Sequence, residues 1–195
     1  MSVDSATAME LTRDLIPIDT STSWAGASMG DKHCEGGDIM LDASAQGFWI
    51  ARDADRFGER HDLGIGTLSI KVSTEDSRGD FLAVELVHRA KGGPPRHLHH
   101  EQDEWFYVVE GEYVIEVGRE RFRLNPGDSV FGPRKIPHGW AFVGEHTGRI
   151  AFTVTPAGQL EAFFRQLSKM GAMGPLDPAF WTPYGLELVG PPIEI

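Results

Sequence analysis

Short apolar stretches alternate with turn signals along most of the chain after residue 46. Leu68, Ile70 and Val72 show the apolar–polar alternation that is typical of a half-buried strand. The run 125–128, Asn-Pro-Gly-Asp, is a strong turn signal. The predicted strands are 47–51, 66–73, 81–89, 104–109, 113–117, 121–124, 129–132, 138–143 and 149–155. Strands this short and evenly spaced predict an all-β fold, either an antiparallel barrel or a jelly roll.

A helical pattern replaces the strand pattern near the C-terminus. Apolar side chains recur there at the spacing i, i+3, i+4 and i+7, at Leu160, Phe163, Phe164 and Leu167. This predicts a helix over 157–170 packed outside the barrel, with Pro156 in its first turn and Gly171 as its stop. The tail after Gly174 is rich in proline and aromatic residues, and we expect it to wrap the surface.

These patterns divide the chain into three parts of one domain. Residues 1–46 are weakly periodic and contain Ser, Thr and Gly clusters, so we expect an N-terminal leader or extension. Residues 47–156 contain the barrel strands, and residues 157–195 contain the helix and the tail. A chain of 195 residues can bury a full hydrophobic core without disulfide bonds.

Four side chains that can bind a metal ion stand at informative places in this pattern. His97 and His99 are two residues apart, so on a strand both point to the same face. Glu104 follows a turn-like stretch, and His138 begins another predicted strand. Strands far apart in sequence face each other across a barrel, so three imidazoles and one carboxylate can surround one ion. A lone buried histidine is usually structural, but four residues in two separate motifs favour a metal site.

The same residues resemble the two motifs of the cupin superfamily. The first motif has a glycine, His-x-His, Glu and a second glycine, and it matches the run Gly92–His99, Glu104 and Gly111. The second motif has Gly, Pro and His, and it matches Gly127, Pro133 and His138. The resemblance implies a cupin barrel in which the three histidines and Glu104 bind one divalent metal ion.

Two positions depart from the cupin pattern. Lys135 stands where the second motif has glycine, so we expect a turn of different shape. Phe142 stands where that motif often has Asn, which is expected to make the pocket more apolar. Within the superfamily, the runs 92–111, 159–164 and 184–192 are similar to the single-domain quercetin dioxygenase-like group.

This second resemblance covers about residues 60–193 and carries an expectation about function. It implies a dioxygenase acting on a small enolisable or aromatic, flavonol-like compound, with Glu104 as general base besides being a ligand, and a homodimer. Imidazole and carboxylate ligands suit Fe, Mn, Co, Ni, Cu or Zn. Two other interpretations stay open because cupins host many chemistries. One is a non-redox isomerase, cyclase or lyase, and the other is a non-catalytic cupin that binds a small molecule.

Strand parity extends the predicted site to three aromatic residues. Trp140 and Phe142 lie two and four residues after His138, and Phe106 lies two residues after Glu104. On a regular strand, side chains at even separations point to the same face. On regular strands these rings would line a pocket for a flat, apolar substrate. Large side chains fill barrel interiors in any case, so that alternative stays open. His100 is expected on the surface, and His88 in the core or on the surface.

Composition and charge narrow the range of partners. The formal net charge is −11, and an acidic surface repels phosphate backbones, so no nucleic-acid partner is expected. No apolar run approaches the ~20 residues that span a bilayer, so no membrane partner is expected either. Cys34 is the only cysteine, which fits a reducing compartment. We therefore expect a cytoplasmic protein with a small-molecule substrate.

Overall fold

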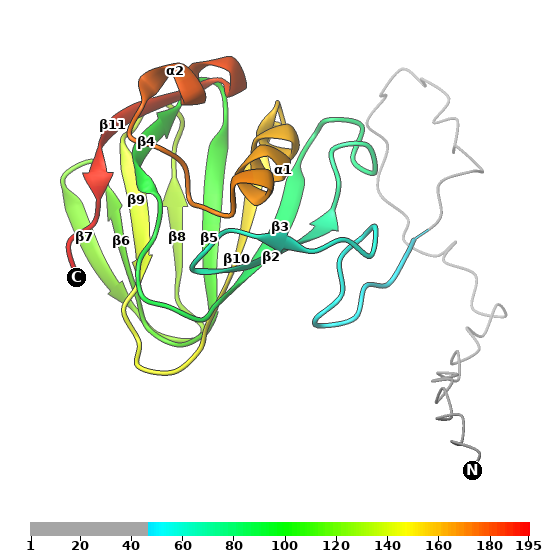
Figure 1. The fold of residues 1–195 in the computed structure, drawn as a ribbon, viewed down its shortest axis with the longest axis horizontal. Coiled ribbons are helices and arrows are strands. Elements are labelled where there is room, and N and C mark those ends of the chain that lie inside the picture. The colour runs from blue at the N-terminus through cyan, green and yellow to red at the C-terminus, as the bar shows by residue number, and fades with distance from the viewer. Residues whose placement is uncertain (1–46) are drawn as a thin grey trace, which may run out of the picture. The chain divides into compact units, whose positions relative to one another are not determined.

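The computed structural model of the protein describes residues 47–195, which form one compact unit. The predicted leader over 1–46, with Cys34, lies outside the described residues. Most of the regular secondary structure in the described part consists of antiparallel strands, which form two sheets (Figure 1). No helix in this part of the chain is long and apolar enough to cross a membrane.

One sheet contains six strands in the order β1-β2-β3-β10-β5-β8. These strands are β1 (His61–Asp62), β2 (Gly66–Val72), β3 (Leu82–His88), β10 (Gly148–Thr155), β5 (Asp103–Glu110) and β8 (Ser129–Gly132). Neighbouring strands pair antiparallel throughout. Along β3, buried and half-buried residues alternate, so one face of this sheet is apolar and turns toward the core.

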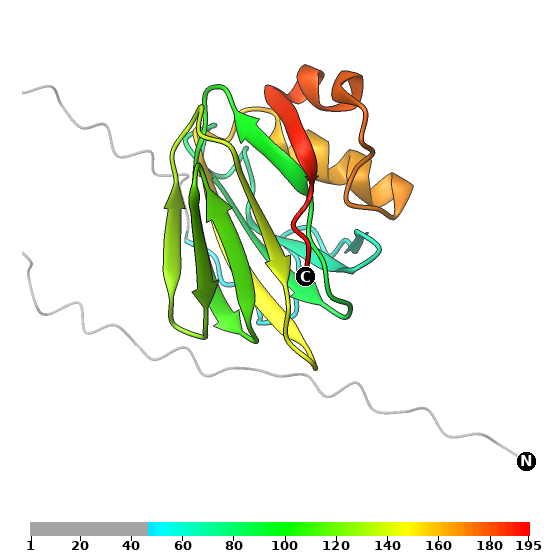
Figure 2. The ribbon, with the colours of Figure 1, turned by 90° about the vertical axis from the view of Figure 1, so that its left-hand side faces the viewer.

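The other sheet contains five strands in the order β11-β4-β9-β6-β7. These strands are β11 (Leu186–Pro192), β4 (Pro95–His99), β9 (His138–Phe142), β6 (Tyr113–Val117) and β7 (Glu120–Leu124). Figure 2 shows the two sheets facing each other. Their inner faces enclose one core cluster, whose fully buried members include Leu68, Leu86, Phe106, Ile115 and Ile150. This architecture confirms the predicted antiparallel jelly roll.

Three strands are absent from the sequence prediction, and one predicted strand is wrong. Residues 47–51 form no strand. β1 is two residues long, which is too short to leave a pattern. β4 and β11 were missed because proline and polar residues interrupt their apolar alternation. The tail is therefore more than a surface wrap: β11 pairs with β4 and places Leu188 opposite His97.

The C-terminal helix is present and lies outside the strands, beside the two sheets (Figure 2). α1 (Leu160–Met170) begins three residues later than predicted, and Pro156 precedes it. Gly158 explains the late start because its φ of +54° is left-handed and cannot continue into a right-handed helix. Gly171 ends the helix as predicted, with φ +63° and its N–H on carbonyls of the last turn. The whole predicted apolar stripe of α1 is buried.

Candidate metal centre

The four predicted ligands come from strands of both sheets. His97 and His99 occupy alternate buried positions of β4, so both side chains point inward. His138, the first residue of β9, lies directly opposite His97 in the β4–β9 pair. Glu104 lies on β5 of the facing sheet. Strand pairing and barrel closure therefore bring together residues that are far apart in sequence.

The ligand atoms of these residues lie within 4.8 Å of one another. Glu104 Oε2 is 3.1 Å from His138 Nε2 and 3.3 Å from His99 Nε2. Tetrahedral ligands with bonds of about 2.0–2.1 Å stand roughly 3.3 Å apart, so these separations suit one ion at the centre. All four residues are buried.

Hydrogen bonds on the far side of each imidazole orient the rings. His97 Nδ1 donates to the Pro95 carbonyl (2.9 Å), and His138 Nδ1 donates to the Ile136 carbonyl (3.0 Å). Because carbonyl oxygens only accept, both Nδ1 atoms carry the proton and both Nε2 atoms present a lone pair. This is the arrangement that metal-binding histidines require.

His99 is oriented by a side chain instead of the backbone. Its Nδ1 lies 3.1 Å from Gln102 Oε1, and Gln102 Nε2 donates to the Ala157 carbonyl (2.8 Å). The amide is thereby fixed with its oxygen toward His99, which places the proton on Nδ1. His99 Nε2 is buried and lacks a well-aligned partner among the described residues, which is the state of a ligand atom that awaits an ion.

The electrostatics of the cluster also suit a cation. Burial raises the pKa of Glu104, but the imidazoles of His138 and His99 beside it outweigh burial and hold the pKa of the carboxyl below its usual range. Burial, together with the neighbouring imidazoles, lowers the pKa of His97 to about 3. His97 is therefore neutral near pH 7, as a ligand must be. Three imidazoles and one ionised carboxylate are donors that fit a divalent transition metal ion.

The turn before β9 keeps its left-handed geometry despite the change from glycine. Lys135 adopts φ +64°, the region that glycine occupies freely. Its N–H donates to the His99 carbonyl (2.7 Å), so the turn is tied to β4 beside the site. Replacing glycine thus has not abolished this conformation, and Lys135 is exposed.

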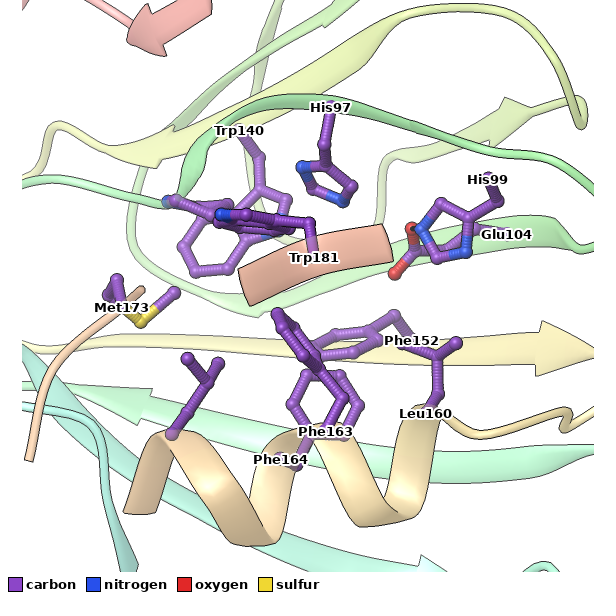
Figure 3. A pocket seen from close by; sticks show the side chains of 12 residues that line it. His97, His99, Glu104, Trp140, Phe152, Leu160, Phe163, Phe164, Met173 and Trp181 are labelled. Atoms are coloured by element: carbon purple, nitrogen blue, oxygen red, sulfur yellow. Dashed lines mark ion pairs between the residues drawn. The ribbon is translucent and has the colours of Figure 1, made fainter. Parts of the chain in front are cut away.

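A small cavity of about 30 Å³ adjoins the four-residue cluster (Figure 3). Its wall is largely apolar and consists of Pro94, His97, His99, Glu104, Trp140, Phe152, Leu160, Phe163, Phe164, Leu167, Met173 and Trp181. A cavity needs about 10–15 Å³ to hold one water molecule, so this cavity has room for two or three waters. Its walls come from both sheets, from α1 and from the tail.

Of the three aromatic residues predicted from strand parity, Trp140 lines this cavity and two do not. Phe106 packs edge-on against His138, with ring centroids 6.0 Å apart, and lies behind the ligand in the core. Phe142 is four residues beyond His138, which is about 13 Å along a strand. It packs instead against His88 and Tyr113, with centroids 5.4 Å away in both cases. Parity alone ignores this displacement along the barrel axis.

Two further histidines, His100 and His88, lie outside the metal cluster. His100 is exposed and lies 3.5 Å from the carboxylate of Glu187. His88 is fully buried, Tyr113 Oη lies 2.8 Å from its Nδ1, and burial lowers its pKa to about 3. His88 is therefore a neutral core residue at the end of the barrel interior away from the metal ligands.

Sequence patterns missed the helix and tail as walls of the cavity. Trp181 is fully buried, and its indole packs against the His97 ring with centroids 5.3 Å apart. Phe163 belongs to the predicted apolar stripe of α1, which was interpreted as packing alone. The signal that was available for Trp181 was the aromatic richness of a tail that was expected to lie on the surface.

Asp55, Glu59 and His61 form a second group whose ligand atoms lie close together. His61 Nε2 is 3.7 Å from Asp55 Oδ2 and 3.4 Å from Glu59 Oε2. Arg165 already pairs with Glu59, and Lys169 lines the same surface depression. These cations offset the carboxylates, so the group is an ion-pair network that ties α1 to the barrel.

The fold and the site agree with the comparisons to known proteins. The cupin domain family matches residues 84–154, a range that includes all four ligands. Quercetin 2,3-dioxygenase of Bacillus subtilis is 26% identical over 133 residues, which cover 68% of this chain and 37% of that protein. The chain spans about a third of the length of the curated relatives it matches.

Two solved structures are similar to part of this one. KdgF from a Halomonas species has a TM-score of 0.48 at 21% identity, over 57% of this chain and 94% of that chain. An RmlC-like cupin from Shewanella frigidimarina has a TM-score of 0.45 at 25% identity, over 57% of this chain and 92% of that one. The jelly-roll fold, the two matching motifs and the family match over residues 84–154 together identify a cupin domain in this chain.

Proposed function

We propose that the protein is a metal-dependent dioxygenase that acts on a small enolisable or aromatic compound. The observation that carries this proposal is the position of Glu104. Its carboxylate lies between two imidazoles and also forms part of the wall of an apolar cavity. A group in that position can serve both a metal ion and a substrate.

The bound metal ion would be held by His97, His99, Glu104 and His138. It would supply Lewis acidity toward a substrate oxygen and, if redox-active, the ability to react with O₂. The three neutral imidazoles add no charge, so a divalent ion and one carboxylate leave a net charge of about +1 at the centre. That charge favours an enolate or carboxylate oxygen as the substrate group next to the ion.

Residues of the chain would have two further roles, which are proton transfer and the exclusion of water. Glu104 is ionised at neutral pH, so either of its oxygens can accept the proton of an enol hydroxyl that lies beside it. Trp140, Phe152 and Phe163 present apolar surface to the same space. This surface suits a flat organic substrate and O₂, and it limits the access of water to a reactive anion.

The relationship to the quercetin dioxygenase of B. subtilis supports the oxidative chemistry over other cupin chemistries. A non-redox isomerase, cyclase or lyase could use the same ligands, since Lewis acidity alone needs no oxygen. The two functions differ in one measurable respect, the need for O₂.

The test is an oxygen-dependence screen of the metal-loaded protein. The full chain is purified, stripped with a chelator and reloaded separately with Fe, Mn, Co, Ni, Cu and Zn. Flavonols and smaller enolisable compounds are then offered under air and under nitrogen. We expect consumption of substrate together with O₂ for at least one redox-active metal, and none under nitrogen. Equal turnover in both atmospheres would refute the dioxygenase and favour the Lewis-acid enzyme.

A further inference from the structure

We propose that Trp181 is the specificity-determining residue of this centre, because it limits the size of the ligand that can reach the metal. The inference rests on the proposed function and deepens it. It states which ligands enter the cavity as the structure has it and which enter only when Trp181 is displaced.

The first step is the mismatch between the cavity and the expected substrate. The space beside the ligands is about 30 Å³. Pockets that bury a drug-sized ligand typically have about 300–1,000 Å³. Thus a diatomic or triatomic ligand fits the structure as it stands, whereas a compound with two or three rings needs one wall to move.

The second step is the identity of the movable wall. Strand ladders hold Trp140 and Phe152 in the middle of the two sheets. Four buried side chains hold α1 to the barrel. Trp181 instead ends α2 (Pro178–Trp181), a four-residue helix that continues into the 3₁₀ turn η1 (Thr182–Tyr184). Figure 3 shows its indole between His97 and the side chains of α1.

The third step is how this segment is attached. The hydrogen bonds around Trp181 stay within the segment: Trp181 Nε1 donates to the Pro175 carbonyl (2.9 Å), and Thr182 Oγ1 donates to the Pro178 carbonyl (3.0 Å). Only its C-terminal end is tied to the chain after β4, since the Gly185 carbonyl accepts from the His100 N–H (3.0 Å). The segment packs on α1 through apolar contacts, in which Phe180, Trp181 and Tyr184 lie against Phe163. The segment lies between Gly171 and Gly185, which both have left-handed φ values, +63° and +76°. Glycines at both ends allow the backbone to pivot with little steric cost.

The fourth step is that the indole packs directly against one of the candidate metal ligands. Its ring lies 5.3 Å from the His97 ring and 5.1 Å from that of Phe163, centroid to centroid. The backbone of Gly174 also packs on it, because a Cβ at that position would stand 2.8 Å from the indole. Replacing the indole by a methyl group therefore opens space directly beside the ligand set, while the four ligands stay in place.

The experiment measures the binding of two probes of different size to the cobalt-loaded full chain. Azide is the small probe and 3-hydroxyflavone the large one, and the visible bands of Co²⁺ report on both. For Trp181→Ala we expect the dissociation constant of 3-hydroxyflavone to fall about tenfold or more, while that of azide changes less than about twofold. Trp105→Ala is the matched control, since Trp105 is exposed on β5, and it should change neither constant.

The results separate this proposal from the proposed function. An unchanged constant for 3-hydroxyflavone in Trp181→Ala, with cobalt and azide bound normally, overturns the role of Trp181. If Trp181→Ala does not fold, Trp181→Phe decides: a threefold or greater gain for the large probe supports the role, and no gain overturns it. Binding as expected without any oxygen consumption refutes the dioxygenase alone. Failure to bind cobalt refutes the metal centre, and the size limit with it.

Discussion

Gln102 offers the sharpest test of how the chain prepares the metal site. The side chain is buried and touches no position where an ion would lie, yet it links His99 to the start of α1. Replacing it by alanine removes the acceptor that fixes the proton on His99 Nδ1. It also removes one of the two donors to the Ala157 carbonyl, which keeps the Leu160 N–H (3.3 Å). We expect two separate effects, one on metal affinity and one on stability.

The size of each effect follows from the contact that is lost. Removing the partner of a metal-binding histidine typically weakens metal affinity about 10–100-fold, which equals about 1.4–2.7 kcal/mol. Losing one hydrogen bond to a buried carbonyl costs about 0.5–1.5 kcal/mol of folding free energy, and that loss is present without metal. The variant should therefore be less stable as the metal-free protein, and the metal should restore less of its stability.

The assay combines chelator competition for Zn²⁺ with urea unfolding of the metal-free protein. Gln159→Ala is the matched control, because it also replaces glutamine by alanine. Gln159 is exposed, and its side chain makes no capping hydrogen bond to α1. It should leave both quantities unchanged. Wild-type zinc affinity in Gln102→Ala, measured on folded protein, would refute the idea that Gln102 prepares His99 for the ion.

Three further predictions concern the ligands and the adjoining turn. His97→Ala should lose most of its bound metal and His100→Ala should keep it; elemental analysis compares them, and full occupancy in both contradicts the ligand assignment. Glu104→Gln should lower turnover per bound metal by about 10²–10⁴, because the amide accepts no proton near neutral pH. Wild-type turnover per metal, measured on a substrate from the oxygen screen, would place the base elsewhere. Lys135→Gly should raise the free energy of unfolding by up to about 1 kcal/mol, since relief of about 1–2 kcal/mol of left-handed strain exceeds the entropy cost of glycine, about 0.5–1 kcal/mol. Urea unfolding measures this, and a less stable variant would show that Lys135 is not strained.

The cluster of candidate ligands could be predicted from local spacing together with the resemblance to the cupin motifs. Two histidines at period two on a strand must share a face, whatever surrounds the strand. Motif spacing supplied the other two members, and the fold brings all four within reach of one ion. The jelly roll was likewise predictable from strands such as Tyr113–Val117 and Ser129–Gly132, whose predicted and observed limits agree. In both cases a short stretch of sequence carries the whole signal.

The cavity could not be predicted in the same way, because its walls meet only in the folded chain. Trp181 reaches His97 after the tail has crossed back and β11 has paired with β4. Its own neighbourhood, rich in proline and without a long period, resembles a surface loop. The prediction that Phe142 lines the pocket was wrong for a related reason. Its distance from His138 along β9 matters as much as the face of the strand to which it points. Both errors concern position in three dimensions, which neither period nor composition records.

The distribution of charge bears on the form in which a substrate arrives. The chain has a formal net charge of −11, and such a surface repels anions during their approach. The cavity wall is mostly apolar, and moving a charge from water into it is costly. A neutral enol meets neither barrier on its way to the metal centre. There Glu104 would accept the proton of the enol hydroxyl, and a divalent ion held by the four residues would supply positive charge next to the oxygen. Under the proposed function, an acidic surface, an apolar cavity and a carboxylate in the cavity wall would thus together favour a substrate that enters neutral and ionises beside Glu104.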